Sequence, residues 1–156
     1  MPQKSPYYPI FIALEQRSCL VVGGGAVAWR KIKGLLDCGA QVTVVAPLLV
    51  PEIEQVVSEG LIAVNRRAFT ATDLENVFLV YAATDDADVN AEILRFAQKR
   101  DILAAAVDKN WDNGDFITPA RFTHQGVTVA VSSDGMSCSR SRDVKNEIQR
   151  FLRNCL

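Results

Sequence analysis

The first stretch whose residues could do chemistry is a glycine turn followed by small side chains. It consists of Gly23, Gly24, Gly25, Ala26, Val27 and Ala28, which fit the pattern G-x-G-x-x-A after an apolar run. In such a turn Gly23 makes the bend, Gly25 lets a pyrophosphate approach, and Ala28 keeps strand and helix close. Free N–H groups at the start of the next helix attract anions. The pattern therefore indicates a dinucleotide cofactor, with a plain glycine turn as the alternative.

The place for the cofactor's ribose departs from the usual pattern. An Asp or Glu normally follows the glycines by about 20 residues and binds the ribose hydroxyls. Here that place is occupied by Ala46 and Pro47. We expect backbone groups around Pro47 and Leu48 to hold the ribose, and the motif alone does not separate NAD from NADP.

Polar residues also follow two later apolar runs. Ala83 and Thr84 end one run, where a small side chain and a hydroxyl suit a bound cofactor, and Asp86 is predicted to cap the following helix. Asp108 ends the next run, and a carboxylate placed there could act as a general base. A turn residue, or a salt bridge between Asp108 and Lys109, is the alternative. In parallel sheets such strand ends share the edge at which ligands bind.

The elements that must position these residues alternate between strands and helices. Strands are predicted at 19–22, 41–46, 61–65, 76–83 and 102–107, and helices at 26–38, 52–59 and within 86–101. The strands are almost continuously apolar, which is typical of a parallel sheet covered on both faces. Residues 1–110 are therefore predicted to form a doubly wound, Rossmann-type α/β domain.

The remaining residues, 111–156, are predicted to form a C-terminal extension of that domain. It has short strands at 116–117 and 126–132 and an amphipathic helix at 143–155. The turn of Ser132, Ser133 and Ser137 either binds an anion or caps the helix. His124 is predicted at the surface. The extension is too short for its own core, so it packs on the sheet or pairs with another chain.

Composition excludes several classes of protein. The chain has 156 residues, 49% of them hydrophobic, and a net charge of −1, which suits one globular core and gives no footprint for nucleic acid. Its apolar runs are too short to cross a membrane, and residues 1–9 do not resemble a secretory signal, so we expect a cytoplasmic protein. Cys19, Cys38, Cys138 and Cys155 have no metal-binding spacing, so reduced thiols and no metal site are expected.

The order of motifs closely resembles the precorrin-2 dehydrogenase family, which also forms the N-terminal module of sirohaem synthases. The resemblance extends over residues 8–150. It is carried by Tyr8-Pro9-Ile10-Phe11, Val21-Val22-Gly23-Gly24-Gly25-x-Val27-Ala28-x-Arg30-Lys31, Ala82-Ala83-Thr84-Asp85-Asp86, Val107-Asp108, Phe116-Ile117-x-Pro119-Ala120 and Val129-Ala130-Val131-Ser132-Ser133.

The resemblance implies an activity, a cofactor and a set of residues. Members oxidise precorrin-2 to sirohydrochlorin with NAD, and some also insert ferrous iron. The cofactor loop would be residues 23–27 with Pro47 and Leu48, the catalytic aspartate would be Asp108, and the chain would form a homodimer through its C-terminal part. The carboxylates of the substrate need a basic and polar surround. Its candidates are Arg121, Arg140, Arg142, Lys145, Ser132, Ser133 and Ser137.

Three positions depart from the family pattern. Ala105 replaces an Asn before Asp108, while Asp134 replaces a glycine and Cys138 a proline in the serine turn. These departures keep a second hypothesis open, in which the chain is a regulatory module that binds NAD without catalysis. A third hypothesis, metal delivery by Cys138 and Cys155, lacks further soft ligands.

Overall fold

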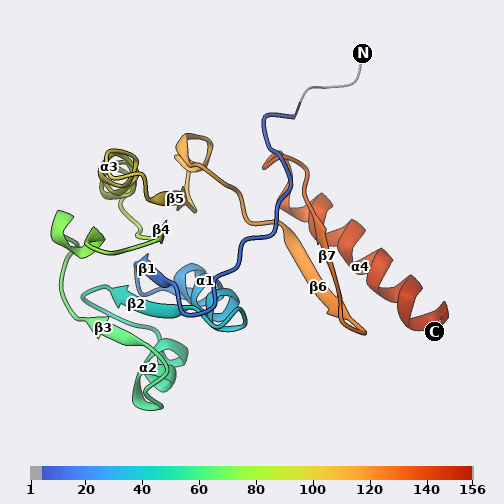
Figure 1. Cartoon of the computed structure of the whole chain (residues 1–156), viewed down its shortest axis with the longest axis horizontal. Coiled ribbons are helices and arrows are strands. Elements are labelled where there is room, and N and C mark those ends of the chain that lie inside the picture. Colours follow the sequence, from blue (N-terminus) through green and yellow to red (C-terminus); the bar gives the residue numbers. More distant parts are fainter. Residues whose placement is uncertain (1–4, 156) are drawn as a thin grey trace. The chain divides into compact units, whose positions relative to one another are not determined.

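The computed structural model describes residues 5–155, which form two compact units (Figure 1). One unit is Phe11–Phe116, and the other combines residues 5–10 with residues 117–155. The sequence prediction placed the boundary between the two parts after residue 110, whereas the larger unit extends to Phe116. The loop after the last strand of the sheet therefore belongs to the larger unit. The two units are described separately below.

The larger unit is built on a five-stranded parallel sheet in the order β3-β2-β1-β4-β5. Its strands are β1 (Ser18–Val22), β2 (Gln41–Val45), β3 (Ala63–Asn65), β4 (Leu79–Ala82) and β5 (Leu103–Ala106). The chain moves outward from β1 to β3 on one side and from β4 to β5 on the other, so the strand order reverses between β1 and β4. Doubly wound folds bind nucleotides at this switch point. The predicted fold class is confirmed, although β4 begins three residues later than predicted.

Apolar side chains fill both faces of this sheet. On one face, Cys19 and Val21 of β1 belong to a core with the helices α1 (Ala26–Leu36) and α2 (Pro51–Ser58). On the other face, Leu20 and Val22 belong to a core with α3 (Ala87–Gln98). Because successive residues of a strand point to opposite faces, burial on both faces requires every position of β1 after Ser18 to be apolar.

Each helix buries one stripe of its surface. In α1 the buried residues are Ala28, Ile32 and Leu35, at helical spacing. An apolar residue at position 27 would be expected to join this stripe from its type alone, but Val27 is 36% exposed, because it lies about 100° around the helix from Ala28. In α3 the predicted cap is confirmed, since the Asp86 carboxylate accepts hydrogen bonds from the first backbone N–H groups of the helix.

The smaller unit is a β-hairpin packed against a long helix. The strands β6 (Ala120–His124) and β7 (Val127–Val131) pair in antiparallel register, and α4 (Cys138–Cys155) contacts both. Residues 116–117 are not a strand, and β6 was not predicted because its alternating polar residues read as loop. Its pattern is that of a half-buried strand, with Phe122 inward and Arg121 and Thr123 exposed.

Two further details of the smaller unit correct the sequence reading. The helix α4 begins five residues before position 143, because its first turns pack through the small buried Ser141 and not through apolar side chains. His124 is only partly exposed, and its Nε2 atom is buried with no hydrogen-bond partner. No helix among residues 5–155 combines the length and apolar character needed to cross a bilayer.

Candidate functional site

The glycine turn between β1 and α1 leaves no room for side chains at its first two positions. Gly23 has a φ of +128°, and a Cβ atom there would lie 2.1 Å from the carbonyl oxygen of Ala83. A Cβ atom on Gly24 would lie 1.9 Å from the carbonyl oxygen of Leu48. The two glycines therefore allow the turn to pack against the ends of the neighbouring strands β4 and β2.

The third glycine faces open space instead. A Cβ atom on Gly25 would meet nothing within 4 Å. Gly25 is the N-cap of α1, no side chain caps the helix there, and its first turn carries no acidic residue. The N–H groups at the start of a helix lack intrahelical partners and carry partial positive charge. The residues present therefore fit the pyrophosphate of a dinucleotide, which would lie against Gly25.

The hollow beside this turn has a volume of about 470 Å³, within the range of small-molecule sites. It is lined by the glycine turn and by residues that follow three strands: 46–50 after β2, 67–69 after β3, and 83–86 after β4. Seven predicted cofactor residues line it: Gly23, Gly24, Gly25, Pro47, Leu48, Ala83 and Thr84. Ala26 and Val27, the other two, do not line it and lie exposed in the first turn of α1.

Arg67 also lines this hollow and was not singled out from the sequence. Its guanidinium binds both carboxylate oxygens of Asp73, whose side chain is only 5% exposed. These hydrogen bonds hold the pKa of Asp73 below its usual range, with further help from the backbone N–H of Thr70. The available signal was position, because Arg67 follows β3 at the same edge of the sheet as the glycine turn.

Asp108 follows β5, and neighbouring amides hold both oxygens of its carboxylate. The Asn90 side chain donates from Nδ2 to Oδ2 at 2.8 Å, and the Asn110 backbone N–H donates to Oδ1 at 2.9 Å. The Asn110 side chain also donates to the carbonyl of Ala87 at 2.8 Å, which ties the loop to α3. Asp108 is partly buried, and no ion pair with Lys109 is formed.

Asn90 joins Asp108 to the cofactor hollow. Its Oδ1 atom accepts from the backbone N–H and the hydroxyl of Thr84, at 3.1 and 2.7 Å, and its Nδ2 donates to the Thr84 carbonyl. The sequence analysis did not select Asn90. A polar residue at helical spacing with the buried Ile93, Leu94 and Ala97 was the signal that could have found it.

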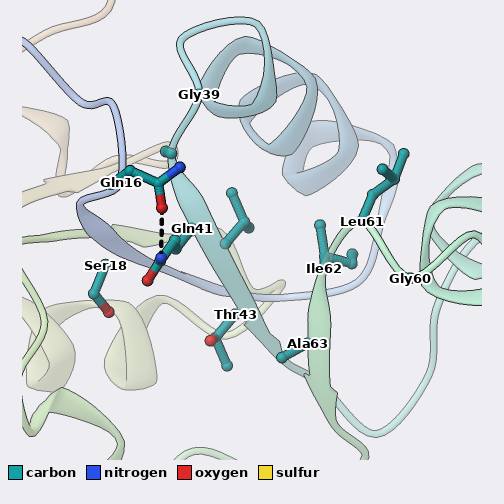
Figure 2. A pocket seen from close by; sticks show the side chains of 11 residues that line it. Gln16, Ser18, Gly39, Gln41, Thr43, Gly60, Leu61, Ile62 and Ala63 are labelled. Atoms are coloured by element: carbon teal, nitrogen blue, oxygen red, sulfur yellow. Dashed lines mark hydrogen bonds between the residues drawn. The ribbon is translucent and has the colours of Figure 1, made fainter.

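A second hollow lies at the opposite edge of the sheet, where β1, β2 and β3 begin (Figure 2). A hydrogen bond between the side chains of Gln16 and Gln41 lies at one end of it, and Ser18 and Thr43 add hydroxyls. None of its lining residues is ionisable. It therefore offers no charged group to phosphates or to an acid–base reaction, and the site candidate stays at the carboxyl edge.

The residues predicted to bind substrate all belong to the smaller unit. Within it the serines form one network: Ser133 accepts from the backbone N–H of Ser137 and from the hydroxyl of Ser141. Ser137 accepts from the backbone N–H of Arg140 at 3.2 Å, so it caps α4. The hydroxyl of Ser132 accepts from the backbone N–H of Asp134. The other predicted substrate residues are the exposed Arg121, Arg140 and Arg142 and the partly exposed Lys145.

Among residues 5–154 no group of three His, Cys, Asp or Glu side chains is placed to hold a metal ion. The described cysteines, Cys19, Cys38 and Cys138, are free thiols.

The parallel sheet, its switch point and the glycine turn at the start of α1 define a Rossmann-type dinucleotide-binding domain. In agreement, residues 10–120 match the family model described as putative NAD(P)-binding. The chain is 36% identical to SirC, a precorrin-2 dehydrogenase of known structure, with a TM-score of 0.79 over 92% of this chain and 70% of that one. The chain therefore belongs to the NAD(P)-binding family that includes SirC.

Curated relatives are longer. The chain is 43% identical over 146 residues to Siroheme synthase 1 of Serratia proteamaculans, and 38% identical to Siroheme synthase of Photobacterium profundum. Each alignment covers 94% of this chain but only 30% and 31% of the relative. The chain thus spans about a third of the length of these curated relatives.

Proposed function

We propose that this chain is an NAD-dependent dehydrogenase that oxidises precorrin-2 to sirohydrochlorin. The observation that carries the proposal is the connection of two sites at one edge of the sheet. The cradle for a dinucleotide at Gly25 and the carboxylate of Asp108 are linked through Thr84 and Asn90. The 36% identity to SirC, over nearly the whole chain, gives this pair of sites its substrate class.

The reaction needs two acceptors, because oxidation of the tetrapyrrole removes a hydride and a proton. NAD, when bound in the hollow beside the glycine turn, supplies the hydride acceptor. Asp108 supplies the proton acceptor. Its Oδ2 atom accepts from the side chains of Asn90 and Asn110, and within residues 5–155 its Oδ1 atom accepts only the backbone N–H of Asn110, which leaves a lone pair of Oδ1 to accept the proton. The role of the protein is to hold the two acceptors in fixed relation.

Arginine, lysine and serine side chains of the smaller unit would bind the carboxylates of the substrate. Arg121, Arg140, Arg142 and Lys145 provide the charge, and Ser132, Ser133 and Ser137 provide hydroxyls. Guanidinium groups pair with carboxylates through two parallel hydrogen bonds, which is stronger than a neutral contact. This assignment rests on charge and on the family resemblance.

The test is turnover of anaerobically prepared precorrin-2 with NAD, followed by the absorbance change of the tetrapyrrole. Replacing Asp108 with Ala should lower kcat by about 100-fold or more, the usual contribution of a general base, while the Kd for NAD stays nearly constant. Asp112, an exposed carboxylate in the following turn, gives the matched control, and Asp112→Ala should retain full activity. Ferrous insertion into sirohydrochlorin, measured with the same variants, shows whether Asp108 also serves chelation.

The outcomes separate the two hypotheses for this chain. Turnover that depends on NAD and is lost in Asp108→Ala supports the dehydrogenase. Binding of NAD in a calorimeter without any turnover of precorrin-2 would instead support the regulatory module.

We also propose that the chain forms a homodimer in the cytoplasm. The side chains of Val144 and Phe151 on α4 are 38% and 65% exposed, and they lie at helical spacing with the partly exposed Ile148. Such a stripe suits an identical stripe on a second copy. Phe151→Glu should convert a dimer into a monomer in light scattering, and a wild-type monomer would contradict the proposal. The free thiols suit a reducing compartment.

A further inference from the structure

We infer that Asn90 is a positioning residue, which fixes the carboxylate of Asp108 relative to the cofactor-binding end of β4. This inference rests on the proposed function, in which Asp108 accepts the proton. Asn90 is fully buried, with 0% of its surface exposed, although it carries a polar side chain on the apolar stripe of α3. A buried amide of this kind is retained only where its hydrogen bonds are made.

The hydrogen bonds of the Asn90 side chain are complete. A side-chain amide has two donors and two acceptor lone pairs, and here all four are used. Its oxygen accepts from the backbone N–H and the hydroxyl of Thr84, and its nitrogen donates to the carbonyl of Thr84 and to Oδ2 of Asp108. Three of these bonds fix Asn90 against Thr84, and the fourth holds the Asp108 carboxylate in place relative to Thr84.

The partners also decide which way round the amide lies. The backbone N–H of Thr84 can only donate, so the atom of Asn90 that lies 3.1 Å from it must be the oxygen. The nitrogen therefore faces Asp108, at 2.8 Å from Oδ2. Because this nitrogen can only donate, the Oδ2 atom is held as an acceptor, in the form that a base needs.

Thr84 connects the Asn90–Asp108 hydrogen bond to the cofactor hollow. Thr84 lines the cofactor hollow, and its backbone nitrogen lies 3.2 Å from where a Cβ atom on Gly23 would be. The contacts therefore run without interruption from the glycine turn through Thr84 and Asn90 to Asp108. A residue that held only the fold together would not need its donor aimed at the carboxylate of the base.

Amides, not charged groups, hold the Asp108 carboxylate. The Asn90 side chain donates one hydrogen bond to it, and the backbone and side chain of Asn110 donate two more. The charged side chains of the adjoining α3, loop and turn residues are exposed to solvent, where water screens them. They are Asp85, Asp86, Asp88, Lys109 and Asp112.

The test compares Asn90→Ala and Asn90→Asp with a matched control in the same helix. Leu94 is 2% exposed on the same stripe, so Leu94→Ala opens the core without touching Asp108. Each variant is measured for turnover of precorrin-2, for the Kd of NAD, and for the pH at which the ¹³C-labelled carboxyl of Asp108 titrates. The Asp108→Asn variant assigns that carboxyl signal.

Three results are expected. Asn90→Ala should lower kcat at least about tenfold, because a base held by one fewer contact is poorly aligned. Asn90→Asp keeps the shape but places a second carboxylate against Oδ2, so the two carboxyls should titrate as a coupled pair, with one step at least about one pH unit above the single step of wild type. The acid limb of the rate should move with it. Leu94→Ala should leave three quantities unchanged: kcat per folded molecule, the Kd of NAD, and the pH at which the Asp108 carboxyl titrates.

Other outcomes would overturn the inference or the proposed function separately. A carboxyl titration in Asn90→Asp with no step above the single step of wild type refutes the contact, whether or not the protein is a dehydrogenase. An unchanged kcat in Asn90→Ala, with an active wild-type protein, refutes the positioning role alone. A wild-type protein that does not oxidise precorrin-2 refutes the proposed function and the role built on it, even where the titration shifts as expected.

Discussion

Gly23→Ala should destabilise the fold strongly, because the turn at Gly23 has no space for a methyl group. An alanine held at a φ of +128° costs about 1–3 kcal/mol of backbone strain. The new Cβ atom would also lie 2.1 Å from the carbonyl oxygen of Ala83, so the two must move apart by about 1.3 Å to reach an ordinary contact distance.

That movement would disturb hydrogen bonds within the sheet. The backbone N–H of Ala83 donates to the carbonyl of Val22 at 2.8 Å, and that of Gly23 donates to the carbonyl of Val45 at 2.9 Å. Weakening one of them adds about 1 kcal/mol. The total loss is then about 2–4 kcal/mol, a large part of the 5–15 kcal/mol that stabilises an ordinary domain.

Gly25→Ala gives the matched control, with the same chemical change two residues further on. Its Cβ atom meets nothing within 4 Å, and the φ of −88° is one that alanine adopts freely. The free energy of unfolding should therefore change by less than about 1 kcal/mol. The added methyl group would stand where the pyrophosphate approaches, so the affinity for NAD should fall at least about tenfold.

Urea unfolding followed by circular dichroism measures the first effect, and calorimetric titration with NAD measures the second. The expected pattern is opposite in the two variants, since Gly23→Ala loses stability and Gly25→Ala loses binding. Equal stability of the two variants would refute the close approach of Gly23 to β4. Normal binding of NAD by Gly25→Ala would refute the cradle at the start of α1.

Two further predictions concern ionisable groups. Because Arg67 lowers the pKa of Asp73 in the folded state, the pair stabilises the fold above the pKa of an unfolded aspartate and this contribution is lost as pH falls through the lower, folded value. Asp73→Asn should thus cost about 1–2 kcal/mol at neutral pH and less in acid, measured by urea unfolding at both; an equal cost in acid would contradict this. Burial raises the pKa of Cys19 to about 11, so native protein near neutral pH should be alkylated at Cys38 and not at Cys19 in peptide maps.

The sequence was sufficient to predict the parallel sheet, for a physical reason. A strand buried on both faces must be apolar at successive positions, as β1 is from Cys19 to Val22, and this pattern is visible without any partner. The hairpin strand β6 carries no such signal. Only one of its faces is buried, and its exposed positions are polar, so its order depends on pairing with β7.

The candidate site was predictable only in part. The glycine turn and Asp108 could be found because local patterns place each at the carboxyl end of a strand, and parallel strands bring those ends to one edge. Arg67 and Asn90 could not be given roles in this way. Their partners, Asp73 for one and Thr84 with Asp108 for the other, are chosen by packing between elements, which residue spacing does not encode.

The close packing at Gly23 and the hydrogen bonds of Asn90 serve the same end. In the proposed reaction a hydride and a proton leave the substrate toward different acceptors, so the distance between the cofactor and Asp108 would have to be fixed before the substrate binds. The close backbone packing of Gly23 on Ala83 positions the cofactor turn against β4. The Asn90 amide positions Asp108 against Thr84, which follows β4. A change at Gly23 should consequently reach Asp108 as well: kcat should fall in whatever fraction of Gly23→Ala remains folded, whereas Leu94→Ala, which loosens the core elsewhere, should not show this effect.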